Sequence, residues 1–138
     1  MSHTEDPLDS QLVDFSTMLV VRDLSASEQF YAGHFGFAVT ERLESLRRLE
    51  RPGVSLYLVL PGDPTSDKPG VRLAPQPVRG ATAVNLIFRV TDVRAVHSAL
   101  VAGGLSFLAP PTQPPWGGWR CFTQDPDGHL IEIEQPSA

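Results

Sequence analysis

The strongest constraint on the fold is an internal repeat. Val21-Arg22-Asp23-Leu24 in the first half matches Val90-Thr91-Asp92-Val93 in the second, at an offset of 90 − 21 = 69 residues in a chain of 138. In each copy an apolar run rich in β-branched residues ends at an aspartate, and a stretch with helical spacing follows. A glycine and a phenylalanine then precede the next apolar run. The repeat predicts two similar units, each half of the chain.

Each copy predicts a strand followed by a helix. Asp23 and Asp92 stand just before the helical patterns, where an aspartate side chain caps the first turn. Glycines at 33 to 36 and at 103 to 104 provide the stop signals. The apolar residues of each helix fall on one stripe that we expect to be buried. These residues are Leu24, Phe30, Tyr31 and Phe35 in the first helix, and Val93, Val96, Leu100 and Val101 in the second.

Short strand-like segments follow each helix. They are Phe37–Leu43, Val54–Leu60, Leu105–Leu108, Gly118–Thr123 and Leu130–Glu134, with a weaker segment around Arg47–Arg51. The tetrapeptide Asp125-Pro126-Asp127-Gly128 predicts a hairpin turn, because proline fixes φ and glycine supplies a positive φ. Each unit is therefore predicted to be βαβββ.

The two units are predicted to form one domain, because about 69 residues bury too little surface to be stable alone. We expect an N-terminal tail over 1–12 and a single domain over 13–138. Within it the modules span about 13–62 and 81–138, and the segment 63–80, which is rich in Pro, Gly and Asp, links them.

Charge and composition exclude several classes of protein. The net charge of −5 disfavours a nucleic-acid partner, which needs a concentrated basic surface. No apolar run approaches the roughly 20 residues of a membrane span, and the polar, acidic start is unlike a secretory signal. Cys121 is the only cysteine, so no disulfide framework exists and a reducing compartment is the simplest interpretation. We expect a cytoplasmic protein with no membrane partner.

The repeat and the terminal motif Asp125-Pro126-Asp127-Gly128-His129-Leu130-Ile131-Glu132-Ile133 resemble the vicinal oxygen chelate superfamily of glyoxalases, bleomycin-resistance proteins and extradiol dioxygenases. The resemblance implies an α+β fold. Two βαβββ modules would form cup-shaped mixed sheets, the glyoxalase/bleomycin resistance fold. In this superfamily the cup is often completed across a homodimer, so the resemblance also implies a homodimer here.

Metal-using members of this superfamily hold a divalent ion with a His or Gln on the first strand of each module and a Glu on the last strand. The matching positions in this chain are Ser16, Tyr57, Asn85 and Glu132. Only Glu132 is a strong ligand at neutral pH. We therefore expect no metal site of this kind and no cofactor.

The four histidines do not replace the missing ligands. His3 lies in the tail, and His34 and His97 fall on the predicted helices. His129 is at an odd spacing from Glu132, so strand alternation sends the two side chains to opposite faces.

Strand alternation predicts which residues line the cup. Beside them, the proline-rich segment 109–120 carries two tryptophans and an arginine, which suit the stacking of a planar ligand. The alternative is that one tryptophan plugs the cup or a dimer groove. The predicted ligand-binding residues are Ser16, Met18, Tyr57, Asn85, Ile87, Arg89, Trp116, Trp119, Arg120, Phe122 and Glu132.

Glu132 is the most specific single candidate for a functional residue. A carboxylate inside a concave sheet costs several kcal/mol unless it is paired or hydrated. Either it meets a cationic or hydrogen-bonding group of a ligand, or Arg89 or Arg120 neutralises it. Glu132 and Tyr57 are also weak candidates for a catalytic base or acid, although Tyr57 also fits as a packed aromatic. Cys121 is interpreted as a small buried hydrophobe.

We interpret the chain as a metal-free protein, similar to bleomycin-resistance and antibiotic-sequestering proteins, that holds a small, partly aromatic molecule in its cup. Turnover is not expected, but the sequence leaves enzymatic activity open. One alternative is a metal-dependent lyase, isomerase or dioxygenase with atypical ligands. The other is an interaction domain with a filled cup.

Overall fold

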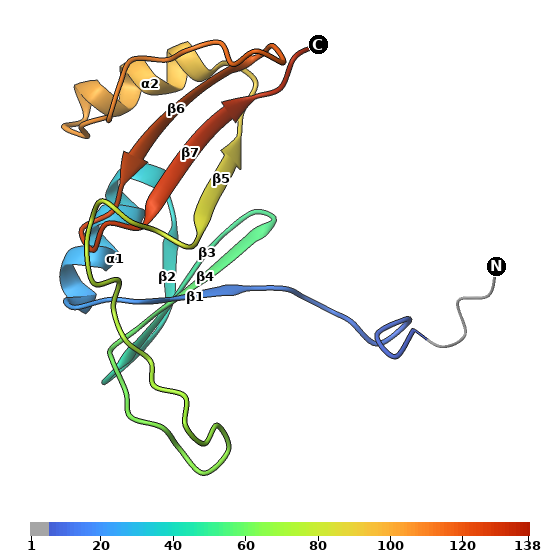
Figure 1. Ribbon diagram of the computed structural model, residues 1–138, viewed down its shortest axis with the longest axis vertical. Helices are drawn as coiled ribbons and strands as arrows, with labels where there is room; N and C mark the ends of the chain where they lie inside the picture. The colour runs from blue at the N-terminus through green and yellow to red at the C-terminus, as the bar shows by residue number, and fades with distance from the viewer. Residues whose placement is uncertain (1–5) are drawn as a thin grey trace.

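The computed structural model describes residues 6–138 and contains two sheets and two helices (Figure 1). The elements in chain order are β1 (Thr17–Val20), α1 (Leu24–Phe35), β2 (Ala38–Leu43), β3 (Leu46–Arg51), β4 (Val54–Val59), β5 (Asn85–Arg89), α2 (Val93–Ala102), β6 (Trp119–Gln124) and β7 (Leu130–Gln135). His3, which is expected in the N-terminal tail, lies outside the described residues. Among the described residues, neither helix has the length and apolar character needed to cross a membrane.

Strand pairing follows the sequence repeat. In the first sheet the order is β1-β4-β3-β2, and β1 runs parallel to β4. In the second sheet the order is β5-β7-β6, and β5 runs parallel to β7. The first strand of each module thus pairs in parallel with the last strand of the same module. Figure 1 shows the two sheets one above the other, with α2 along the outer side of the second sheet. The α+β fold that the resemblance implied is confirmed.

The predicted caps begin both helices. The Asp23 carboxylate accepts a hydrogen bond from the Ala26 N–H at 3.0 Å, and Asp92 accepts one from the Ala95 N–H at 3.1 Å. The first helix ends at Gly36, whose φ of 71° is the left-handed conformation that glycine adopts at low cost. The first glycine of the expected stop, Gly33, lies inside α1 instead.

The expected strand Leu105–Leu108 is wrong: this segment is irregular, and the second sheet has three strands. Isolated backbone hydrogen bonds, and not a continuous ladder, join residues 105–112 to β6. The Leu108 N–H donates to the Phe122 carbonyl at 2.9 Å, and Thr112 and Arg120 exchange two backbone hydrogen bonds. The prolines between them, at 110 and 111, have no N–H to donate, so a continuous ladder does not form.

One apolar core contains residues from both modules. Phe35 of α1 stacks on Phe88 of β5, with ring centroids 5.0 Å apart and planes 22° apart, and this contact joins the halves. Val101 does not belong to the buried stripe expected for the second helix. Val101 is 48% exposed, because the described core reaches α2 mainly through Val93, Val96 and Leu100.

Candidate functional site

Strand register divides the predicted ligand-binding residues between the two sheets. On the first sheet Met18 lies opposite Tyr57. On the second, Glu132 lies between Ile87 and Phe122 of the neighbouring strands. Alternate residues of the same strands, such as Leu19, Leu58 and Ile133, are buried in the core, so the predicted residues face away from it.

The two open faces carry different members of the predicted set. The first-sheet face has Met18 and Tyr57, with Ser16 just before β1, and the second-sheet face has Asn85, Ile87, Arg89, Arg120, Phe122 and Glu132. None of the three cavities described for residues 6–138 is lined by both Tyr57 and Glu132. In these cavities of a single chain, the two halves of the predicted cup do not meet.

Glu132 is 5% exposed, and its Oε1 accepts a hydrogen bond from Asn85 Nδ2 at 2.8 Å. Neither arginine expected to neutralise it does so. Arg89 Nε pairs with Glu134 Oε1 at 2.7 Å, and the Arg120 guanidinium lies 4.9 Å from the ring centroid of Trp116. Within the described part of the chain, no ion pair involves Glu132. The Glu132 carboxylate therefore has one hydrogen bond from an amide and no cationic partner among the described residues.

Trp116 and Trp119 lie in different environments. Trp116 is 68% exposed, and the Arg120 guanidinium stacks on it. Trp119 is partly buried against the core, and the Arg94 guanidinium of α2 lies 4.3 Å from its ring centroid. The Trp119 side chain therefore contacts α2, although it also lines a small cavity with Trp116 and Arg120. The sequence already indicates this difference, because Trp119 and Arg120 are adjacent on β6 and adjacent residues of a strand face opposite ways.

Arg48 on β3 is a residue of the first-sheet face that the sequence analysis missed. It lies opposite Tyr57 in the register, and its guanidinium is 5.5 Å from the centroid of the Tyr57 ring. Its Nε is buried and has no hydrogen-bond partner among residues 6–138. Treating 47–51 as a full strand with alternating faces would have identified Arg48.

A second cluster missed by the sequence analysis lies at the β6–β7 turn. The Asp125 carboxylate accepts hydrogen bonds from Tyr31 Oη at 2.7 Å and from His129 Nδ1 at 2.8 Å. The other oxygen, Oδ1, accepts hydrogen bonds from the backbone N–H groups of Asp127 and His129. Burial opposes ionisation, but the hydrogen bonds from His129 and Tyr31 outweigh it and hold the pKa of Asp125 below its usual range.

The ligating atoms of Asp125, Asp127 and His129 lie within 4.8 Å of one another, yet the cluster does not fit a metal ion. The Arg22 guanidinium and backbone N–H both donate to Asp127 Oδ1, at 3.1 and 3.0 Å. With Asp125 saturated by four donors, a cation would meet donors and a positive charge instead of free lone pairs. The cluster fastens the β6–β7 turn to α1.

The four positions taken from the resemblance do not fit a metal ion either. Ser16, Tyr57 and Asn85 offer a hydroxyl, a phenol and an amide, which are weak ligands for a divalent ion at neutral pH. The Asn85 amide is already used as a hydrogen-bond donor to Glu132. Of the four, Glu132 alone presents a free carboxylate oxygen.

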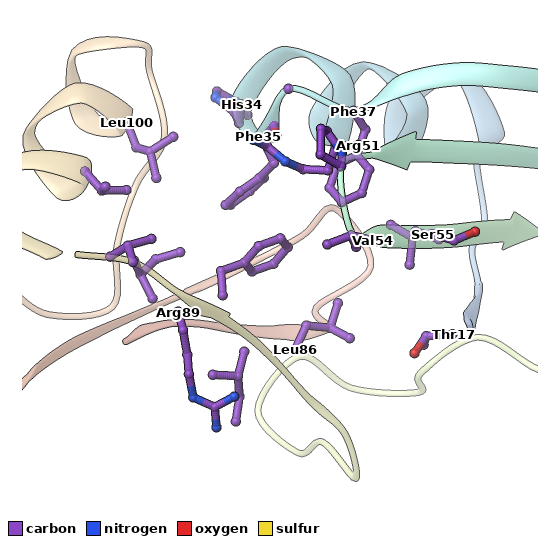
Figure 2. A pocket seen from close by; sticks show the side chains of 18 of the residues that line it. Thr17, His34, Phe35, Phe37, Arg51, Val54, Ser55, Leu86, Arg89 and Leu100 are labelled. Atoms are coloured by element: carbon purple, nitrogen blue, oxygen red, sulfur yellow. Dashed lines mark hydrogen bonds between the residues drawn. The ribbon is translucent and has the colours of Figure 1, made fainter. Parts of the chain in front are cut away.

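A groove of about 870 Å³ is the largest cavity described for residues 6–138. It lies between the C-terminal end of α1, the β3–β4 hairpin, β5 and α2 (Figure 2). Of the predicted ligand-binding residues, only Asn85, Ile87 and Arg89 line it. The groove is therefore a feature that the sequence analysis did not foresee.

A family model described as "Glyoxalase/Bleomycin resistance protein/Dioxygenase superfamily" matches residues 15–133. No curated protein sequence gives a match. Among solved structures, the chain is similar to a glyoxalase/bleomycin resistance protein/dioxygenase from Nocardioides, with 24% identity and a TM-score of 0.73 over 90% of this chain and 83% of that one. A glyoxalase-related enzyme from Fulvimarina pelagi is 29% identical, with a TM-score of 0.64 over 90% and 88%.

A bleomycin-binding protein solved in complex with bleomycin is also similar in fold. It is 21% identical, with a TM-score of 0.66 over 91% of this chain and 100% of that one.

Proposed function

Because this chain belongs to the glyoxalase/bleomycin resistance protein/dioxygenase superfamily, we propose that it binds a small molecule on the open face of its second sheet and sequesters it without a metal. The proposed ligand has a planar aromatic part and a group that donates hydrogen bonds or carries positive charge. Turnover is not part of the proposal.

Glu132 is the observation that carries this proposal. Its carboxylate is 5% exposed and receives one hydrogen bond from an amide. Desolvating a carboxylate costs several kcal/mol unless a cation or several donors compensate. No residue of the described chain forms an ion pair with it. A cationic or hydrogen-bond-donating ligand group would supply the missing partner.

Aromatic side chains beside Glu132 suit the planar part of the ligand. Phe122 lies opposite Glu132 in the register, and the Arg120 guanidinium is 5.3 Å from the Phe122 ring centroid. Trp116, the other ring that the Arg120 guanidinium contacts, is 68% exposed and offers a surface for a flat ring. The similar fold that binds bleomycin supports this class of ligand.

We further propose that the protein acts as a homodimer in the cytoplasm, the compartment suggested by its single cysteine. The first-sheet face, with Met18, Arg48 and Tyr57, and the second-sheet face, with Glu132, share no described cavity in one chain. A second copy would bring one face of each kind together and complete the cup.

A thermal-shift screen with bleomycin and flat quinone antibiotics tests the binding. At a ligand concentration of 100 Kd, binding stabilises the folded state by about 2.7 kcal/mol, which raises Tm by several degrees in a domain of this size. We expect the shift to fall in Trp116→Ala and in Glu132→Gln, because each removes one proposed contact. Trp119→Ala is the matched control, because the Trp119 side chain contacts α2. In this variant the ligand should raise Tm by as much as it does in wild type.

Three outcomes would contradict the proposal. The first is an equal shift in wild type and Glu132→Gln for every compound that binds, and the second is no shift with any compound. The third is a stoichiometric divalent metal in the purified wild-type protein that Glu132→Gln loses, which would favour a metal-dependent enzyme.

A further inference from the structure

The groove at the end of α1 borders the open face of the second sheet: both include Asn85, Ile87 and Arg89 of β5, but the groove continues towards α1 and α2. We propose that it binds an amphipathic carboxylate, that is, an organic acid with an apolar tail, with the acid group on Arg51 and the tail between α2 and β5. This inference does not rest on the function proposed above, because Phe122, Trp116 and Glu132 are not among the groove residues.

The walls of the groove are apolar and come from several elements. Phe35 of α1 and Phe88 of β5 form a stacked pair, and Val96 and Leu100 of α2 face the same space. Figure 2 shows Leu100 on one side of the groove and Phe35 and Phe37 on the other. Its volume of about 870 Å³ falls in the range of roughly 300–1,000 Å³ typical of small-molecule sites. An apolar tail would be desolvated there.

Arg51 provides a fixed cation at one end of the groove. Its Nη1 donates to the Phe35 carbonyl at 2.6 Å, which holds the guanidinium against the C-terminal end of α1 (Figure 2). Among residues 6–138, no carboxylate lies within 4.0 Å of it, and its Nε and Nη2 have no protein acceptor. A carboxylate is the planar acceptor that matches the guanidinium fork.

Gly36 makes room for this arrangement. A Cβ at position 36 would come within 3.0 Å of Arg51 Nη1, and the backbone there has a φ of +71°. The sequence thus places the one residue without a side chain where the guanidinium approaches the helix end.

The charge of the groove is opposite to that of the protein as a whole. The chain carries a net charge of −5, yet no aspartate or glutamate lines the groove, whereas His34, Arg51 and Arg89 do. Arg89 is already paired with Glu134 at 2.7 Å. Arg51 therefore remains as the cation without an acidic partner, and the groove selects for an anion.

Calorimetric titration with decanoate, and with decan-1-ol as an uncharged analogue, tests the charge selectivity. We expect decanoate to bind one per chain and at least about tenfold more tightly than decan-1-ol, because hydrogen bonds to a charged group are stronger than neutral ones. In Arg51→Gln the decanoate affinity should fall at least about tenfold while that of decan-1-ol stays the same. Arg72→Gln, a change in the linker outside the groove, is the matched control and should leave both affinities unchanged.

Gly33→Leu tests the apolar part without disturbing the fold. Gly33 lines the groove, and a Cβ there meets no atom within 4 Å. Leucine also favours a helix more than glycine does. The added side chain should therefore weaken decanoate and decan-1-ol binding alike, and Glu132→Gln should weaken neither.

Three outcomes would overturn the proposal: no decanoate binding to wild type, equal affinity for decanoate in wild type and Arg51→Gln, or unchanged binding in Gly33→Leu. Size-exclusion chromatography of the same variants adds a fourth. A wild-type dimer that does not bind decanoate and becomes a monomer in Gly33→Leu would show that a second copy fills the groove instead.

Discussion

Neighbouring positions on β6 and β7 have opposite environments because side chains alternate across a strand. Phe122 faces the open side with Glu132, whereas Cys121 faces the core with Ile133. Burial raises the pKa of the Cys121 thiol to about 11, and the negative charge of Glu132 adds to the effect. At neutral pH this thiol is protonated, and the protonated form is a poor nucleophile.

Cys121 is therefore predicted to resist alkylation in the folded protein. With iodoacetamide at pH 7.5, mass spectrometry should show little labelling under native conditions and complete labelling in concentrated urea. A Cys121→Ser/Ser137→Cys variant, with its thiol on the exposed C-terminal segment, provides the reactive comparison. Equal native rates for wild type and this variant would contradict the burial of Cys121.

The irregular segment from 109 to 118 replaces a fourth strand in the second module and joins β6 through two glycines. Gly118 has a φ of +74°, and a Cβ there would lie 2.3 Å from the Gln135 carbonyl oxygen. That oxygen belongs to backbone at the end of β7 and cannot swing aside like a flexible side chain. The close approach fixes where the chain enters β6 and therefore where exposed Trp116 lies.

Gly118→Ala is predicted to destabilise the protein far more than Gly70→Ala. Gly70 has a similar φ of +76°, but a Cβ there meets nothing within 4 Å. Gly70→Ala should therefore lower the free energy of unfolding only by the conformational penalty of about 1–2 kcal/mol. Gly118→Ala adds the backbone clash and should exceed that value by at least about 1 kcal/mol. Urea unfolding of the two variants measures the difference, and equal losses would refute the close approach.

The two modules are joined by polar contacts as well as by the apolar core. Asp125 and Asp127, at the turn of the second module, accept hydrogen bonds from Tyr31 and Arg22 of the first. Asp125 is fully buried, and its donors favour the ionised carboxylate. The packing of one module on the other therefore depends on a charge that acid can remove.

The stability of the whole molecule is predicted to fall in acid through Asp125. Because its folded-state pKa lies below the unfolded value of about 3.9, its contribution is complete above that pH and is lost as the pH drops through the folded pKa. Asp125→Asn should lower the free energy of unfolding at pH 7 by about 2–4 kcal/mol, and its stability should change less between pH 5 and pH 2 than that of wild type. Urea unfolding across this range, with the exposed Asp63→Asn as control, checks both. Parallel pH profiles for wild type and Asp125→Asn would exclude this role.

The repeat predicted both helices, the caps at Asp23 and Asp92 and most of the strands, with Leu105–Leu108 as the exception, and the proline and glycine of Asp125–Gly128 predicted the turn. These features depend on preferences of the local backbone and on alternation within a few residues, which the sequence displays directly. The same alternation already implied that Trp119 and Arg120 face opposite ways, although the predicted site included both.

The tertiary structure determined which residues that are distant in sequence form ion pairs, hydrogen bonds and apolar contacts. It left Glu132 without a cation by turning Arg89 to Glu134 and Arg120 to Trp116. It joined Tyr31 to Asp125 across 94 residues of sequence, and it set Arg51 at the mouth of an apolar groove. Sequence spacing determines the face on which a side chain lies. Distances between separate elements arise only when the whole core packs, and those distances determine which charges are paired and which remain available to a ligand.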